Sequence, residues 1–190
     1  MELMRIPRRF WEASLDRVPE SIRPVVEKYV LDIESRLDAG EGIIFLGDNG
    51  VGKTCAAVVI AKAARRLGAP VLFITAESLR QAVLNDEIFS EDQTVYDRAR
   101  TVELLVLDDW GKEHKGNTSY AEHLFENLIR ERASTKLVTL ATTNIKWSDF
   151  SANFKQSLLE VMRECMYPLV TKGPNNRIEA EGRLAAELTI

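Results

Sequence analysis

Cysteine, long apolar runs and the apolar core of a signal peptide are scarce or missing in this sequence, and each absence narrows the classes of protein to which it can belong. The two cysteines, Cys55 and Cys165, lack the close spacing of metal ligands, so we expect reduced thiols inside the cell. No apolar run approaches the roughly 18 residues of a membrane-spanning helix. The segment Met1–Trp11 lacks the apolar core of a signal peptide. We therefore expect a cytoplasmic protein with no membrane partner.

An excess of positive charge is also missing, since the formal net charge is −4 and the isoelectric point is near 5.4. This balance argues against a surface coated with nucleic-acid-binding charge, but it leaves room for a local basic strip. Internal repeats and low-complexity linkers are absent, and 190 residues suffice for one packed domain. We expect a single domain over 1–190, with an N-terminal arm and helix over 1–41, a core over 42–178 and a tail over 179–190.

A glycine-rich segment after a short apolar run is the strongest motif present. Residues 47–54 match the pattern G-x-x-x-x-G-K-S/T, and they lie between Ile43–Leu46 and a stretch rich in alanine and valine. In a strand–loop–helix context this pattern cradles phosphates with backbone N–H groups, a lysine and a metal-binding hydroxyl. We therefore predict bound ATP and Mg²⁺, with Thr54 as a metal ligand. The residues expected to bind the nucleotide are Gly47, Asp48, Asn49, Gly50, Val51, Gly52, Lys53, Thr54 and Cys55, although Cys55 also suits helix packing.

Apolar runs alternate with helical patterns along the rest of the chain. Continuous apolar strands separated by helices are typical of a parallel sheet covered on both faces. We predict an α/β three-layer αβα sandwich of the P-loop NTPase type, with a five-stranded parallel sheet and little or no lid domain. The expected strands are 43–46, 71–74, 104–107, 137–141 and a short one near 169–170, and the main expected helices are 21–37, 54–67, 77–84, one from about 118 and 154–165.

An acidic pair, Asp108 and Asp109, directly follows the third apolar run. Ligands bind at the carboxyl ends of strands in open α/β sheets. We expect Asp108 to hold Mg²⁺ through water and Asp109 to orient or deprotonate the attacking water. A helix cap is the alternative for this pair. Asp109 is one methylene shorter than the glutamate that is common at such positions. We therefore expect slow ATP hydrolysis, which suits a molecular switch better than a motor.

The fourth apolar run leads into Asn144, whose amide could contact the γ-phosphate or the lytic water and so sense the nucleotide state. A turn role is the alternative for this residue. A small-molecule kinase is a competing interpretation of the whole pattern, but the late arginine-rich lid typical of such kinases is not found. A nucleotide-binding interaction module with negligible turnover is a further alternative.

Taken together, these motifs resemble the AAA+ class, and specifically the family of DnaC/DnaI-type helicase loaders and IstB-type transposition ATPases. The resemblance is carried by residues 6–10, 47–54, 71–79, 104–113 and 140–144. It implies self-association of neighbouring protomers through the nucleotide interface, with arginines acting across it. Arg163 matches the position of the arginine finger, and Arg177 matches a second arginine near the last strand. Arg130 and Arg132 are further candidates, for which salt bridges on a helix surface are the alternative.

The resemblance also implies partners. It implies a slowly hydrolysing ATPase that acts in DNA replication by associating with a replicative helicase and single-stranded DNA, or alternatively one that regulates a transposase. The candidate DNA contacts are Arg65, Arg66, Arg80, Lys112 and Lys115. Fewer than fifty residues precede the phosphate loop, so Arg5–Trp11 or Glu179–Ile190 is a candidate for partner recognition in place of a separate domain. A short surface helix or a frayed end is the alternative for Glu179–Ile190.

Overall fold

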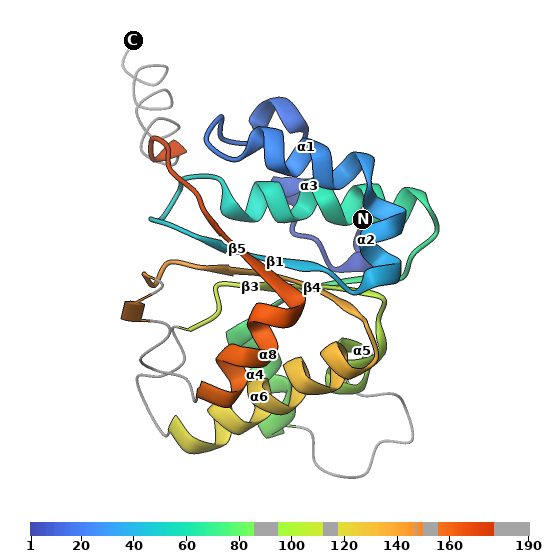
Figure 1. The fold of residues 1–190 in the computed structure, drawn as a ribbon, viewed down its shortest axis with the longest axis vertical. Coiled ribbons are helices and arrows are strands. Elements are labelled where there is room, and N and C mark those ends of the chain that lie inside the picture. Colours follow the sequence, from blue (N-terminus) through green and yellow to red (C-terminus); the bar gives the residue numbers. More distant parts are fainter. Residues whose placement is uncertain (86–94, 112–117, 147, 150–155, 177–190) are drawn as a thin grey trace.

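A parallel five-stranded sheet forms the centre of the computed structural model, which describes residues 1–85, 95–111, 118–146, 148–149 and 156–176 (Figure 1). The strands lie in the order β2-β3-β4-β1-β5, and each neighbouring pair is parallel. The predicted α/β sandwich is thereby confirmed, with a fifth strand longer than expected. The strands are β1 (Gly42–Leu46), β2 (Val71–Thr75), β3 (Leu104–Asp108), β4 (Val138–Thr143) and β5 (Met166–Val170).

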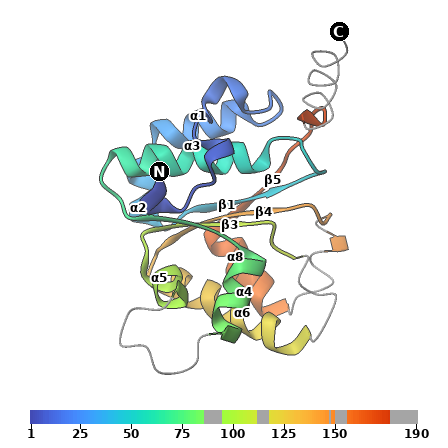
Figure 2. The same cartoon turned by 180° about the vertical axis from the view of Figure 1, so that it is seen from behind.

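Helices cover both faces of this sheet and complete the three layers (Figures 1 and 2). One face carries α1 (Arg23–Leu31), α2 (Ile33–Ala39) and α3 (Lys53–Arg66). The other face carries α4 (Ala76–Asn85), α5 (Val95–Thr101), α6 (Thr118–Ser134) and α8 (Gln156–Cys165). Before α1 the chain forms three short 3-10 turns, η1 (Glu2–Met4), η2 (Arg8–Phe10) and η3 (Leu15–Arg17).

Each face of the sheet has its own apolar core, because successive side chains of a strand point to opposite faces. Ile43 and Phe45 of β1 belong to the core under α3, whereas Ile44 and Leu46 belong to the core on the side of α4, α6 and α8. All residues of β1 and β3 are buried, as is typical of strands covered on both faces. The continuous apolar runs in the sequence therefore reflect two-sided burial.

The helix expected over 21–37 is two helices that meet at Asp32. The backbone of Asp32 leaves the helical region, with φ −98° and ψ 18°. The break lets Ile33 and Leu37 stay in the core while Leu31 is exposed. Pro24 lies in the first turn of α1, where its missing N–H costs no hydrogen bond.

A buried arginine joins α6 to the amino end of the sheet. Arg132, a further candidate for the arginine finger, is 0% exposed, so the alternative of a salt bridge on a helix surface is wrong for this residue. Its guanidinium donates to the carbonyl oxygens of Ala99 at 2.8 Å, Val102 at 2.7 Å and Val138 at 2.5 Å. It also donates to Thr139 Oγ1 at 2.9 Å. Burial lowers the pKa of Arg132 to about 9, which leaves it charged at neutral pH.

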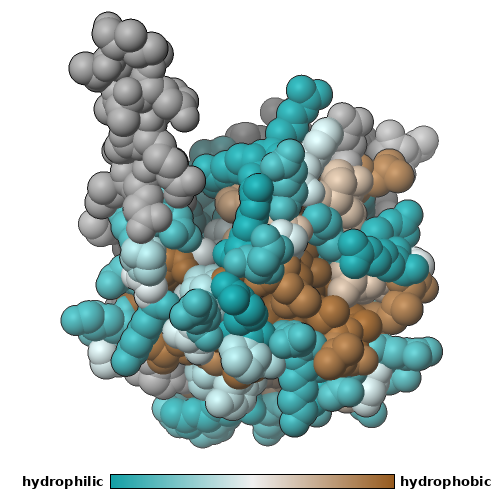
Figure 3. Space-filling view, turned by 90° about the horizontal axis from the view of Figure 1, so that it is seen from above, coloured by the Kyte–Doolittle hydropathy of each residue, from teal (hydrophilic) through white to brown (hydrophobic). Residues whose placement is uncertain are grey.

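The surface seen from the side of α1 and α3 is mostly hydrophilic, and apolar residues are exposed over only part of it (Figure 3). Among the described residues, the large apolar side chains that are exposed are Leu3, Val25, Leu31, Leu67, Tyr167 and Val170. Within the same residues, no helix has the length and apolar character needed to cross a bilayer.

Candidate nucleotide site

The phosphate loop connects the carboxyl end of β1 to the amino end of α3, as predicted from its flanks. Gly47 and Gly52 have φ of 145° and 95°, which side chains with a Cβ rarely adopt. A Cβ added at Gly47 would lie 2.3 Å from the carbonyl oxygen of Thr171, and one at Gly52 would lie 2.7 Å from Cγ of Pro19. Both glycines are therefore required by the backbone conformation and by the space around them.

Lys53 begins α3 and folds back into the loop. Its side chain is largely buried, with 5% of the residue exposed. The ammonium donates to the carbonyl oxygens of Gly47 at 2.8 Å and Asp48 at 2.7 Å, and to Asn144 Oδ1 at 2.6 Å. The lysine therefore lies where the motif predicts it, within the curve of the loop and in contact with the end of β4.

The two predicted metal ligands, Thr54 and Asp108, are in direct contact. Thr54 Oγ1 donates a hydrogen bond of 2.8 Å to Asp108 Oδ1. Burial raises the pKa of the Asp108 carboxyl, while hydrogen bonds from Thr142 and Thr54 lower it and so offset part of that rise. A carboxylate and a hydroxyl are ligands that Mg²⁺ accepts in proteins. The donor set at this edge therefore fits Mg²⁺.

Asp109 lies within the same network, on the other side of Asn144. Its backbone is left-handed, with φ 58°. Asn144 Nδ2 donates to Asp109 Oδ1 at 2.9 Å, while Asn144 Oδ1 accepts the bond from Lys53. One amide thus joins the phosphate-binding lysine to the candidate base. The sheet order explains this meeting, because β4 lies between β1 and β3.

A cleft beside the phosphate loop was not predicted from the sequence. It has a volume of about 930 Å³ and lies between residues 16–23 and residues 172–176, with Val51 of the loop on its wall. Ser21 Oγ donates to the carbonyl oxygen of Lys172 at 2.6 Å, and the N–H of Asn176 donates to the carbonyl oxygen of Gly50 at 3.2 Å. These bonds join both walls of the cleft to each other and to the phosphate loop. Its walls come from distant parts of the chain and carry no local motif.

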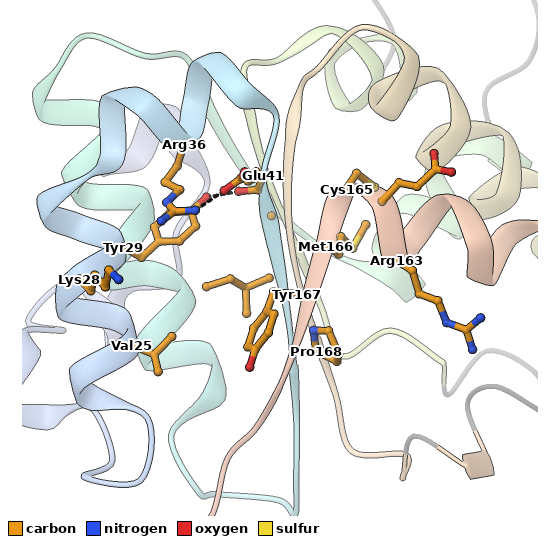
Figure 4. Close-up of a pocket in the computed structure, with 13 residues that line it drawn as sticks. Val25, Lys28, Tyr29, Arg36, Glu41, Arg163, Cys165, Met166, Tyr167 and Pro168 are labelled. Carbon is orange, nitrogen blue, oxygen red and sulfur yellow. Dashed lines mark hydrogen bonds and ion pairs between the residues drawn. The ribbon is translucent and has the colours of Figure 1, made fainter.

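Arg163 is not near the phosphate loop of its own chain. Arg163 is exposed near the end of α8, just before β5 begins at Met166. Because Met166 is paired with Gly42 at the amino end of β1, Arg163 lies near the amino edge of the sheet. It borders a groove of about 510 Å³ between α1 and β5, where its side chain extends away from Tyr29 and Arg36 (Figure 4). The phosphate loop lies at the opposite, carboxyl edge. Arg177 lies outside the described residues.

The other predicted contact residues, which are Cys55 for the nucleotide and the basic residues for DNA, do not gather at one site in the described part of the chain. The Cys55 side chain is half-buried against the core under α1 and α3, and burial raises the pKa of its thiol. Arg65 and Arg66 end α3 at the amino edge of the sheet. Arg80 lies in the middle of α4, which follows the carboxyl end of β2, and it pairs with Glu77. The described arginines therefore do not form one continuous track. Lys112 and Lys115 lie outside the described residues.

The fold and this site define the class of the protein, a P-loop nucleotide-binding ATPase of the AAA+ type. Residues 29–164 match the family model described as IstB-like ATP binding protein. The chain belongs to this IstB-like family of AAA+ ATPases, whose members bind ATP.

Individual relatives agree with that assignment. The chain is 30% identical over 148 residues to a putative ATP-binding protein in an insertion sequence of Mycobacterium tuberculosis, covering 74% of this chain and 57% of that relative. The chain thus spans little more than half of that relative's length. The crystal structure of the DnaC helicase loader is similar with a TM-score of 0.74 and 26% identity, covering 87% of this chain and all of that one. The crystal structure of DnaI is similar in fold, with a TM-score of 0.71 and 23% identity, covering 90% of this chain and 93% of that one.

Proposed function

We propose that this protein is an ATP-dependent assembly switch that binds ATP with Mg²⁺, hydrolyses it slowly and, while ATP is bound, holds a partner that acts on DNA. The observation that carries the proposal is the continuous contact from Lys53 through Asn144 to Asp109. It joins the phosphate loop to a candidate base in a single hydrogen-bonded network. A network of this kind can respond to the presence of a γ-phosphate.

In this proposal each side chain of the network has one task. Lys53 binds the β- and γ-phosphates, and Thr54 with Asp108 would hold Mg²⁺, which neutralises phosphate charge when bound. Asp109 takes a proton from the attacking water, and Asn144 orients that water or the γ-phosphate. Loss of the γ-phosphate removes one partner of Asn144, so the network relaxes after hydrolysis.

Self-association would complete the site. Arg163 lies at the amino edge, away from its own phosphate loop, so an arginine finger at this position has to act on a neighbouring protomer. Replacing Arg163 with alanine should then lower turnover without weakening ATP binding to the isolated chain. In mixtures, Arg163→Ala subunits should regain turnover when combined with Asp109→Asn subunits, because each supplies what the other lacks. Mixtures without activity would exclude a finger role for Arg163.

The partner has two candidates. A replicative helicase, with single-stranded DNA, is the first, and it is supported by the likeness to the DnaC helicase loader over the whole of that chain. A transposase is the second, and it is supported by the family model and by the relative in an insertion sequence.

An Asp109→Asn variant tests both the switch and the partner. We expect it to bind ATP like the wild type and to lose hydrolysis, so that it stays in the ATP-bound assembly. The purified variant is mixed with the helicase or the transposase of the source organism, with ATP or ADP, and analysed by size-exclusion chromatography. Asp38→Asn, on the exposed surface of α2, is the matched control. Normal hydrolysis by Asp109→Asn, or wild-type turnover well above roughly 10 s⁻¹, would contradict the proposal.

A further inference from the structure

One threonine contacts three consecutive residues at the end of β3. Thr142, on β4, is 1% exposed. Its hydroxyl donates to Asp108 Oδ1 at 2.7 Å and accepts from the N–H of Asp109 at 3.0 Å. Its carbonyl oxygen accepts from the N–H of Trp110 at 2.8 Å.

These contacts hold a turn that is unfavourable by itself. Asp109 has φ 58°, a left-handed conformation that aspartate adopts more readily than most residues with a Cβ, but still at a cost in free energy. The turn sends the carboxylate of Asp109 toward Asn144 and lets Trp110 enter the core, where it is 0% exposed and lies 6.0 Å from Phe125 between ring centroids. The Thr142 hydroxyl bonds the amide N–H of the very residue that is left-handed.

We propose that Thr142 is the positioning residue of the acidic pair. Its donated hydrogen bond, together with that of Thr54, fixes the rotation of the Asp108 carboxylate. Its accepted bond holds Asp109 in the left-handed turn, where the carboxylate meets Asn144. The inference about Asp109 rests on the proposed ATP hydrolysis, whereas the inference about Asp108 rests only on Mg²⁺-dependent binding of ATP.

Thr142→Val tests this role, because valine keeps the shape and removes the hydroxyl. We expect kcat to fall about tenfold, since both acids lose a hydrogen bond that sets their geometry. We also expect the Mg²⁺ concentration for half-maximal ATP binding to rise severalfold, with ATP affinity in EDTA unchanged. Thr142→Ser keeps the hydroxyl and should restore both quantities.

Thr139→Val is the matched control. Thr139 is a buried threonine of the same strand, and its hydroxyl bonds Arg132 and not the acids. We expect it to lower thermal stability and to leave kcat within about twofold of the wild type. If Thr142→Val does not fold, Thr142→Cys, which is close in size and a poor hydrogen-bonding group, takes its place.

The outcomes separate this inference from the proposed function. An unchanged kcat and an unchanged Mg²⁺ dependence in Thr142→Val would overturn the positioning role, as would an equal loss in Thr139→Val. If the wild type binds ATP with Mg²⁺ but does not hydrolyse it with any partner, the proposed hydrolysis fails and the Mg²⁺ titration alone decides the role of Thr142. If the wild type does not bind ATP, both are refuted.

Discussion

Replacing Arg132 with methionine should be among the most destabilising single changes in this protein. Arg132 carries a buried positive charge, and the oxygen atoms that accept its hydrogen bonds belong to α5, to Val102 just after α5 and to β4. Methionine fills much of the same volume but donates no hydrogen bond. The carbonyl oxygens that the guanidinium satisfies would then remain buried without a donor.

The structure sets the size of the effect. Three carbonyl oxygens, of Ala99, Val102 and Val138, accept bonds of 2.8 Å or less, and the hydroxyl of Thr139 accepts a fourth. Leaving a buried polar group unsatisfied costs about 1–3 kcal/mol. The buried charge itself is costly, and its removal offsets part of the loss. We expect the free energy of unfolding to fall by about 3–5 kcal/mol, because several acceptors lose their donor at about 1–3 kcal/mol each and removal of the buried charge offsets part of that sum.

Urea denaturation followed by far-UV circular dichroism measures this change. With an m-value of about 2 kcal/mol/M, the midpoint should fall by about 2 M. Arg130→Met is the matched control, because Arg130 is on the same helix, is partly exposed and pairs only with Glu126 among the recorded contacts. That change should cost less than about 1 kcal/mol. Equal midpoints for the two variants would refute the argument.

Two further predictions concern the nucleotide site. Gly52→Ala should abolish ATP binding measured by calorimetry, because the added Cβ would lie 2.7 Å from Cγ of Pro19 at a φ of 95°. Gly68→Ala is the control, since Gly68 has the same φ but no atom within 4 Å of the added Cβ. It should lower stability and leave ATP binding intact. Asp108→Asn should lose the Mg²⁺-dependent binding of ATP. In metal-free buffer at neutral pH it should also melt at a higher temperature than the wild type. The reason is that burial raises the pKa of Asp108, so the ionised carboxylate destabilises the folded state. A raised pKa in the folded state means that the wild type gains stability as pH falls through that pKa, so the advantage of Asp108→Asn should shrink toward acid pH. A melting difference that is absent, or that grows with acid, would contradict this reasoning.

Features that depend on neighbouring residues in the sequence were predictable. The phosphate loop, the acids after β3 and the apolar strands have local patterns, and the resemblance they supported agrees with the family found. The location of Thr54 and Asp108 at one edge followed from a general rule, because ligands bind at the carboxyl ends of the strands in open α/β sheets.

Features made by distant segments were not predictable. Arg132 reads as one of several charged residues on α6, and only the packing of α5 and β4 around it reveals a buried guanidinium. Thr142 belongs to an apolar strand with several threonines, and nothing local distinguishes it from Thr139. The left-handed turn at Asp109 likewise depends on bonds between two strands, because aspartate tolerates a positive φ better than most residues but does not require it.

The contacts of Lys53 mean that ATP binding at this lysine is an exchange of hydrogen-bond acceptors. The ammonium already has the carbonyl oxygens of Gly47 and Asp48 and the amide oxygen of Asn144 as partners, so phosphate oxygens have to displace some of them. The net free energy gained at Lys53 is the difference between its hydrogen bonds to charged phosphate oxygens and those to neutral oxygens. The carbonyl oxygens that lose the ammonium need new hydrogen-bond donors. We therefore expect ATP binding to change the hydrogen bonds of Gly47 and Asp48 even before any bond of ATP is broken.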